Sequence, residues 1–446
     1  MSTVVALSTP RGRGALAVIR LSGPLAIAIA QQLARVDAFE PRHATLVKLT
    51  AGDEELDQVL LTCFPAPHSL TGEDVVEISC HGSPAIARRI IDATLASGAV
   101  LAGPGEFTLR ALTNGKLNLA QAEAIRDLIA AQTDAAVKQA SRQLNGELSN
   151  TLDPFKQNLI EVIVLLESAL EFVEDDLPAV QVNRIEQTLS SVIAGVDRLS
   201  ESYGGGRLLQ EGARVAIAGR PNVGKSSLFN ILVRHERAIV TDIPGTTRDT
   251  LSEAIDIGGV PVVLTDTAGL RYTSDDVETL GIERTHRAMG DADVVLLVFD
   301  GSTKVGPEDR DLLEQTAEAQ RIVVMNKSDL STFEPLTRFV PDVQAINVSA
   351  RTGDGLAALH DELLRKLNSA ESENGSLLIT NARHYDLLCN AGKELRTALD
   401  CFRDRRSEEL VLVPLHNALR MLGQITGETT TEDILSEIFA TFCIGK

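Results

Sequence analysis

A phosphate-binding loop constrains the fold of this chain more than any other feature. Residues 219–226 read Gly-Arg-Pro-Asn-Val-Gly-Lys-Ser and match the pattern GxxxxGK[ST]. A strand is expected over residues 214–218 and a helix from Lys225 onward, which is the strand–turn–helix setting that the motif requires. The glycines let backbone N–H groups point at phosphate oxygens, while Lys225 reaches the terminal phosphates and the Ser226 hydroxyl binds Mg²⁺.

A second motif, Asn326-Lys-Ser-Asp329, predicts that the bound base is guanine. The Asp329 carboxylate can accept both N–H groups of the guanine N1/N2 edge, which adenine lacks, and such sites discriminate strongly. The two motifs together predict a GTPase and disfavour an ATPase or kinase. The residues predicted to contact GTP are Asn222, Val223, Gly224, Lys225, Ser226, Ser227, Thr241, Thr246, Thr247, Asp266, Gly269, Asn326, Lys327, Asp329, Ser349 and Ala350.

Two segments between these motifs complete the expected metal and γ-phosphate contacts. Asp266 opens Asp-Thr-Ala-Gly269 at the end of a predicted strand, so it is expected to hold Mg²⁺ through water while the Gly269 N–H senses the γ-phosphate. Thr247 of Gly245-Thr-Thr is expected to close over Mg²⁺. An ordinary loop is the alternative for that segment.

Leu270 follows Gly269, at the position where small signalling GTPases carry a water-orienting glutamine. Leucine cannot orient water, so another residue, an ion or a second protomer must supply catalysis. Nearby candidates are Arg271 and an acidic run of Asp275, Asp276 and Glu278.

Hydrophobic periodicity predicts a multidomain chain of α+β and α/β parts. Residues 1–116 are expected to form an α+β domain, 117–207 and 371–446 two parts of a helical domain, and 208–370 a Ras-like domain with a mainly parallel sheet. Tyr203-Gly-Gly-Gly206 and residues 368–375 are predicted linkers. Insertion of the α/β domain into one helical domain is favoured, and two separate helical domains are the alternative.

The predicted elements follow from this pattern, with helix breaks near 145–146, 153–154 and 175–178. Strands are expected over residues 4–7, 15–21, 56–64, 74–79, 214–218, 262–265, 294–299, 322–325 and 345–348, and helices over 84–97, 380–402 and 408–422.

Composition narrows the class of protein further. The net charge is −20, and almost all of it lies beyond residue 116, which disfavours a protein that coats nucleic acid by bulk electrostatics. No apolar run approaches the ~20 residues of a membrane helix, and the first residues lack the basic region of a secretory signal. The five scattered cysteines favour free thiols in a reducing cytoplasm.

Further segments make the chain resemble the bacterial tRNA-modification GTPase family MnmE, also called TrmE. They are Thr71-Gly-Glu-Asp74, Gly103-Pro-Gly-Glu-Phe107, residues 116–127 and 237–249, and the terminal Cys443-Ile-Gly-Lys446. The nucleotide motifs alone would also fit a regulatory GTPase of ribosome assembly without modification chemistry, which is the alternative. The N-terminal segments and the terminal motif are more specific.

The resemblance implies a potassium-dependent cycle in a homodimer. The first domain would dimerise, and the inserted G domains would meet when GTP, Mg²⁺ and K⁺ bind. It also implies K⁺ ligands at Asn222, Thr241, Ile243 and Thr246. The implied catalytic residues are Glu278, which organises water, with Asn222, Thr247 and Arg271. A solvated surface acid is the alternative for Glu278.

The resemblance also implies a folate cofactor and a partner. A reduced formyl- or methylene-tetrahydrofolate would bind the first domain, with Arg20, Glu77, Arg110 and Lys116 as candidate contacts and surface ion pairs as the alternative. Cys443 is either a nucleophile or a residue that orders the tail. The flavoprotein MnmG (GidA) would supply FAD, NADH and much of the tRNA-binding surface, so that a carboxymethylaminomethyl-type group reaches C5 of the wobble uridine.

Overall fold

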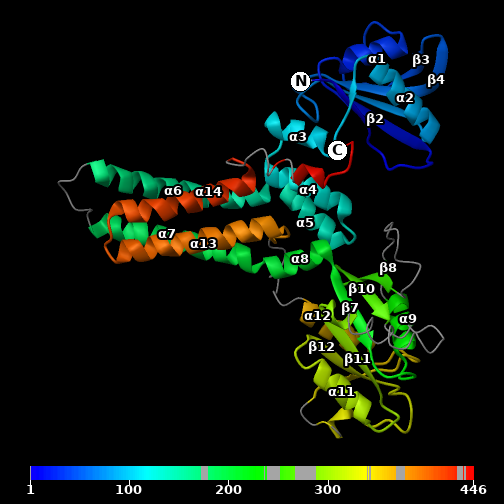
Figure 1. Ribbon diagram of the computed structural model, residues 1–446, viewed down its shortest axis with the longest axis vertical. Coiled ribbons are helices and arrows are strands. Elements are labelled where there is room, and N and C mark those ends of the chain that lie inside the picture. Colours follow the sequence, from blue (N-terminus) through cyan, green and yellow to red (C-terminus); the bar gives the residue numbers. More distant parts are fainter. Residues whose placement is uncertain are drawn as a thin grey trace, which may run out of the picture. The chain divides into compact units, whose positions relative to one another are not determined.

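The computed structural model describes residues 2–171, 179–235, 237–238, 252–266, 288–338, 340, 343–367, 377–428, 435 and 438–445 (Figure 1). Contacts divide the chain into two compact units. The first contains residues 1–126, 144–149 and 423–446, and the second contains 127–143 and 150–422. The chain is a multidomain α+β and α/β protein, as predicted, and the exact bounds of its four parts stay predictions.

The first unit is built on a six-stranded sheet in the order β3-β4-β5-β2-β1-β6. All neighbours are antiparallel except β1 and β6. Helices α1 and α2 contact the sheet and bury Ile19, Leu21, Leu61 and Ile78 in a shared core. The elements are β1 (Val4–Leu7), β2 (Leu16–Ser22), α1 (Ala26–Ala34), β3 (Thr45–Ala51), β4 (Glu54–Phe64), β5 (Val75–His81), α2 (Pro84–Ala96), β6 (Val100–Leu101) and α3 (Glu106–Thr113).

Helices from both ends of the chain form one bundle, which agrees with an inserted α/β domain rather than two helical domains. In Figure 1, α6, α7, α13 and α14 run alongside one another. An ion pair between Glu186 and Arg403 at 2.5 Å joins α7 to α13, and a hydrogen bond between Glu167 and His416 at 3.2 Å joins α6 to α14. The helices are α4 (Leu119–Ala130), α5 (Asp134–Leu144), α6 (Glu147–Glu171), α7 (Ala179–Glu201), α8 (Tyr203–Glu211), α13 (Ala382–Arg403) and α14 (Glu408–Thr426).

The predicted linker at residues 203–206 is wrong, because these residues begin helix α8. Gly206 is needed for packing rather than for flexibility: a Cβ there would lie 2.1 Å from the carbonyl oxygen of Ile379. The Ile379 N–H donates to Ser202 Oγ at 3.0 Å, and the ring of Tyr203 stacks on Tyr385 at 4.4 Å. The chain segments that enter and leave the inserted domain therefore lie side by side.

The predicted break at residues 153–154 is also wrong, since α6 continues through Pro154. The break near 145–146 is confirmed by the gap between α5 and α6. The predicted break at 175–178 and the predicted linker over 368–375 lie outside the described residues.

The inserted domain has a seven-stranded sheet in the order β13-β12-β11-β7-β10-β9-β8. The first five strands in that order are parallel, and β9 pairs antiparallel with both of its neighbours, β10 and β8. The carboxyl ends of the parallel strands therefore share one edge. The elements are β7 (Ala213–Ala218), α9 (Lys225–His235), β8 (Arg237–Ala238), β9 (Ser252–Ile257), β10 (Val260–Asp266), β11 (Val294–Asp300), α11 (Pro307–Gln315), β12 (Arg321–Asn326), β13 (Ala345–Asn347) and α12 (Leu356–Leu367).

Within the part of the chain that the structure describes, no helix has the length and apolar character to cross a bilayer.

All five cysteines are free thiols, as expected. Burial raises the pKa of the Cys63 and Cys80 thiols to about 11.

Two glycines of α8 provide a matched test of the contact between the segments that flank the inserted domain. Gly206→Ala should destabilise the protein by about 1–3 kcal/mol, because the new methyl group meets the Ile379 backbone. Gly204→Ala has open space around its Cβ and should stabilise by about 0.5–1 kcal/mol. Thermal melting of both variants under identical conditions measures the difference. Equal shifts in Tm would contradict the close packing at Gly206.

Candidate functional site

The phosphate-binding loop connects β7 to α9 and packs tightly against two neighbouring strands. A Cβ on Gly219 would lie 2.3 Å from the carbonyl oxygen of Val298, and one on Gly224 would lie 2.2 Å from Asn326 Nδ2. Both glycines also have positive φ angles, as does Asn222 at 64°. Asparagine is among the few side chains that adopt this left-handed conformation readily. The loop therefore requires glycine at both positions and tolerates asparagine between them.

Lysine and serine from the start of α9 face the centre of this loop. Lys225 Nζ donates to the carbonyl oxygens of Gly219 and Arg220 at 2.8 and 2.7 Å. Ser226 Oγ donates to Asp266 Oδ2 at 2.6 Å, and Asp266 is fully buried at the end of β10. The structure thus brings the predicted residues Lys225, Ser226 and Asp266 together near the carboxyl ends of β7 and β10.

The chemistry of this cluster fits magnesium and phosphate. Hydroxyl and carboxylate oxygens are the hard ligands that Mg²⁺ prefers, and phosphate oxygens complete its coordination in nucleotide sites. Among the described residues, no group of three or more His, Cys, Asp or Glu side chains could hold a metal ion. Ser226 and Asp266 would therefore hold Mg²⁺ together with the nucleotide.

Asn326 joins the phosphate-binding loop to the loop after β13. Its Nδ2 donates to the Val223 carbonyl oxygen at 2.8 Å, and its Oδ1 accepts from the Ala350 N–H at 3.0 Å. The side chain is buried. Both ends of the amide are thus engaged within the protein, so Asn326 fixes the distance between the two loops.

Asp329 and Lys327 lie at the same edge, where the base is predicted to bind. Asp329 Oδ1 accepts from Ser349 Oγ at 2.7 Å, which orients the carboxylate. Lys327 has a left-handed backbone, and its Nζ lies 2.5 Å from Asp300 Oδ2. These contacts connect the Asn-Lys-Ser-Asp segment with both neighbouring loops.

Asp300 is a site residue that the sequence analysis missed. Burial alone would raise the pKa of this carboxyl group, but hydrogen bonds from Lys327 and Ser302 outweigh burial and lower it below its ordinary value. The carboxylate therefore stays charged and holds Lys327. The one sequence signal was its position directly after the apolar run 294–299; that it lies opposite Asn326 is visible only in the strand register.

Several predicted site residues lie outside the described residues, and the structure says nothing of them. They are Thr241, Ile243, Thr246, Thr247, Gly269, Leu270, Arg271 and Glu278, together with Asp275 and Asp276.

In the first unit, the structure brings Arg20, Glu77 and the C-terminal tail together. Arg20 and Glu77 are direct partners on β2 and β5 and form an ion pair at 2.7 Å. Arg20 Nη1 and Ser8 Oγ both donate to the Gly445 carbonyl oxygen, at 3.3 and 3.0 Å. The Arg20 guanidinium lies 5.7 Å above the Phe107 ring. The tail therefore packs beside two of the four predicted folate contacts.

Cys443 is exposed, and its backbone carbonyl accepts from the Gly105 N–H at 3.3 Å. The next residue, Ile444, forms a β-bridge with Pro104. The tail is thus ordered by backbone pairing at this point.

Arg110 and Lys116 lie in a second polar group. Arg110 is buried and forms ion pairs with Glu73 at 2.9 Å and Glu106 at 2.7 Å. These partners come from the Thr-Gly-Glu-Asp and Gly-Pro-Gly-Glu-Phe segments, so Arg110 links the two motifs. The Lys116 side chain packs against Gly72 of the first motif.

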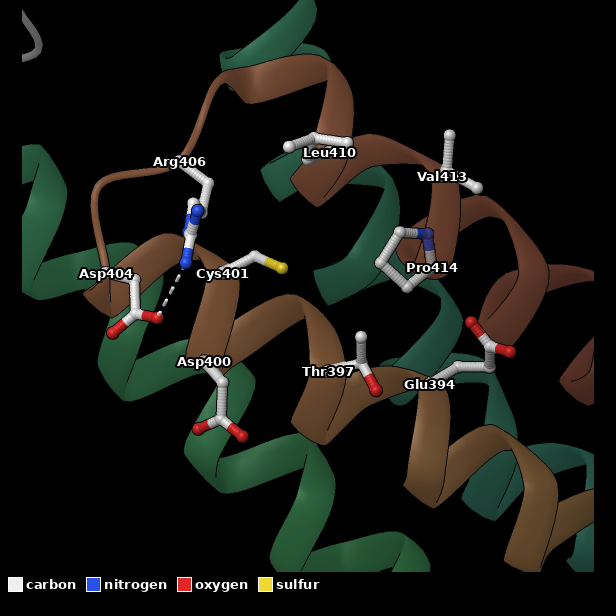
Figure 2. Close-up of a pocket in the computed structure, with 9 residues that line it drawn as sticks. All are labelled: Glu394, Thr397, Asp400, Cys401, Asp404, Arg406, Leu410, Val413 and Pro414. Atoms are coloured by element: carbon white, nitrogen blue, oxygen red, sulfur yellow. Dashed lines mark ion pairs between the residues drawn. The ribbon is translucent and has the colours of Figure 1, made fainter.

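A pocket of 590 Å³ in the helical bundle is a different kind of site. Figure 2 shows it between the end of α13 and the start of α14, with Asp400, Asp404 and Glu394 around it. Carboxylates repel phosphate groups, and the phosphate-binding loop supplies none of the lining residues. The lining residues are Glu394, Thr397, Asp400, Cys401, Asp404, Arg406, Leu410, Val413 and Pro414.

Two family models match this chain. The model described as the GTP-binding protein TrmE N-terminus matches residues 3–116, and the model described as the MnmE helical domain matches residues 119–443. A solved structure, the G domain of the T. maritima FeoB iron transporter, is 31% identical over 34% of this chain and 98% of that chain. Its TM-score is 0.26, so it adds nothing to the assignment.

Curated relatives match from end to end. The tRNA modification GTPase MnmE of Koribacter versatilis is 42% identical over 100% of this chain and 99% of its own length. The tRNA modification GTPase MnmE of Aquifex aeolicus is 43% identical over 99% of each chain. Together with the family models and the nucleotide-binding edge described above, these matches show that the chain belongs to the MnmE (TrmE) family of tRNA modification GTPases.

Proposed function

We propose that this GTPase hydrolyses GTP to drive a 5-carboxymethylaminomethyl-type modification of the wobble uridine in tRNA. The observation that carries the proposal is the single sheet edge that gathers Lys225, Ser226, Asp266 and Asp329. Lys225 binds the terminal phosphates, Ser226 binds Mg²⁺ directly, and Asp266 holds it through water. Asp329 reads the guanine edge.

The proposed hydrolytic step depends on K⁺ and on Glu278. Asn222 would contribute to K⁺ binding from the left-handed turn of the loop, with Thr241, Ile243 and Thr246 as further ligands. A cation next to the phosphates would offset the negative charge that develops there. Glu278 would orient the attacking water, and Thr247 and Arg271 would complete the catalytic residues.

We also propose that the protein works as a homodimer through its first unit. Helices α1 and α2 contact the six-stranded sheet, yet Leu16, Leu46 and Leu60 on its strands are exposed. Leu46 and Leu60 are direct cross-strand partners. Clustered exposed apolar side chains favour a protein–protein contact, and a second copy of this surface would cover them.

The proposed one-carbon donor is a reduced formyl- or methylene-tetrahydrofolate bound in the first unit. Arg20 suits a carboxylate of the glutamate tail, and Glu77 suits the N–H edge of a pterin. The remaining proposed partners are the flavoprotein MnmG (GidA), with FAD and NADH, and the tRNA. The net charge of −20 supports a partner that holds most of the tRNA.

The base pocket is tested by Asp329→Asn. The variant should bind GTP at least about 100-fold more weakly, because an amide cannot accept both guanine N–H groups, and it should gain affinity for xanthosine triphosphate. Equilibrium titration with both nucleotides measures the change. Asp361→Asn, on an exposed side chain of α12, is the matched control. Unchanged GTP affinity in Asp329→Asn would place the base elsewhere.

The potassium requirement is tested by GTP turnover in K⁺ and in Na⁺, with Asn222→Gly as the variant. Glycine keeps the left-handed backbone and removes only the amide. We expect turnover at least about ten-fold faster in K⁺ for the unmodified protein, and loss of that difference in Asn222→Gly. Equal turnover in both salts would remove K⁺ from the mechanism.

The folate site is tested by calorimetric titration of the full chain with 5-formyltetrahydrofolate. Arg20→Gln should weaken binding by about 10–100-fold, since it removes a charge-assisted hydrogen bond. Glu186→Gln breaks an exposed ion pair in the helical bundle and should leave binding unchanged. Absence of binding by the unmodified protein would contradict the folate assignment. Equal binding by Arg20→Gln would move the folate site away from Arg20.

A further inference from the structure

An ion pair between the partly exposed Arg220 and the buried Asp309 connects the phosphate-binding loop to helix α11. Arg220 is the second residue of the loop, and Asp309 is the third residue of α11. Arg220 Nε lies 2.6 Å from Asp309 Oδ1. Only 1% of Asp309 is exposed. Neither the phosphate-binding motif nor the base-reading motif includes Asp309, and the proposed mechanism leaves it unused.

The start of α11 fixes the position of the Asp309 carboxylate. Its other oxygen, Oδ2, accepts from the Gly306 N–H at 2.8 Å, which caps the helix. The Arg220 guanidinium packs against the same glycine, because a Cβ on Gly306 would lie 3.4 Å from Arg220 Nη1. The start of α11 therefore holds the Asp309 carboxylate in place, and the position of the Arg220 guanidinium follows from it.

The two side chains depend on each other for charge compensation. Their short distance does not meet the geometry of a hydrogen bond, and neither Arg220 Nε nor Asp309 Oδ1 has a hydrogen-bond partner among the described residues. The contact is therefore mainly Coulombic. A buried charge that loses its partner is strongly destabilised, so Arg220 is held firmly in this conformation.

The backbone of Arg220, whose side chain is held by Asp309, contacts the phosphate-binding residue Lys225. Its carbonyl oxygen accepts from Lys225 Nζ at 2.7 Å, next to the bond that Lys225 makes with Gly219. Asp309 thus orients Arg220 from the side chain, and Arg220 orients Lys225 from the backbone. Two contacts, Asp309 with Arg220 and Arg220 with Lys225, therefore connect α11 to the phosphate-binding lysine.

We propose that Asp309 is a positioning residue for GTP binding, which acts through Arg220 to hold the loop in the shape that Lys225 needs. This inference rests on the proposed GTP-binding function. Lys225 contacts phosphates in the ground state and in the transition state alike. A displaced loop therefore weakens both states equally and raises KM with little change in kcat.

The test uses Asp309→Asn, Arg220→Gln and the double variant in the full chain. We measure the Kd of a fluorescent GDP analogue, together with KM and kcat for GTP. Each single variant should raise Kd and KM about ten-fold and keep kcat within about two-fold. The double variant should be no worse than the weaker-binding single variant, because residues that act as a pair are not additive. Arg220→Lys, which keeps the charge, should recover part of the affinity.

The control is Glu334→Gln, which breaks an exposed ion pair with Arg338 in the same domain and should change none of these values. A lower Tm with unchanged Kd and KM would overturn the proposal and leave Asp309 a structural residue of α11. Additive losses in the double variant would overturn it as well. If Asp309→Asn does not fold, Arg220→Gln decides alone, because it leaves the helix cap intact. Failure of the unmodified protein to bind GTP would instead refute the proposed function.

Discussion

The nucleotide site depends on the close approach of three loops around the buried side chain of Asn326. Its amide bonds to Val223 in the phosphate-binding loop and to Ala350 in the loop after β13. Gly224 is required by the same contact, since any side chain there would overlap Asn326. The phosphate-binding loop and the loop after β13 are therefore held at a constant separation. A nucleotide that spans the two loops in one bound conformation needs such a separation.

In the first unit, close packing of glycines likewise brings the C-terminal residues against polar side chains. Gly445 lies so close to Leu7 that a Cβ would be 2.3 Å from its carbonyl oxygen, and a Cβ on Gly105 would lie 2.8 Å from Phe439 and 2.9 Å from Phe442. The tail thereby reaches Arg20, and the buried Arg110 joins the Thr-Gly-Glu-Asp and Gly-Pro-Gly-Glu-Phe segments. Each of these two polar groups thus brings together residues from distant parts of the sequence.

Much of the fold followed from local pattern, and the exceptions have physical causes. Strands β1, β7 and β11 were predicted because apolar runs with turn signals at their ends have few other conformations. Helix α1 and strands β3 and β9 were missed. Helix α1 carries β-branched Ile27 and Ile29, which weaken its helical signal. Residues 203–206 read as a linker because glycine has poor helix propensity, but the contact with Ile379 allows only glycine at 206.

The sequence by itself predicted the nucleotide chemistry, because the phosphate-binding motif and the Asn-Lys-Ser-Asp motif are each short runs of adjacent residues. It also predicted the five parallel strands of the α/β domain, but it missed β8 and β9. Only the tertiary structure decided which distant groups support those motifs. Asp300 holds Lys327, Asn326 joins two loops, and Asp309 compensates Arg220. These contacts join residues that are 24 to 103 positions apart in the chain, so no local pattern reveals the pairing; they meet because the parallel strands end at one edge.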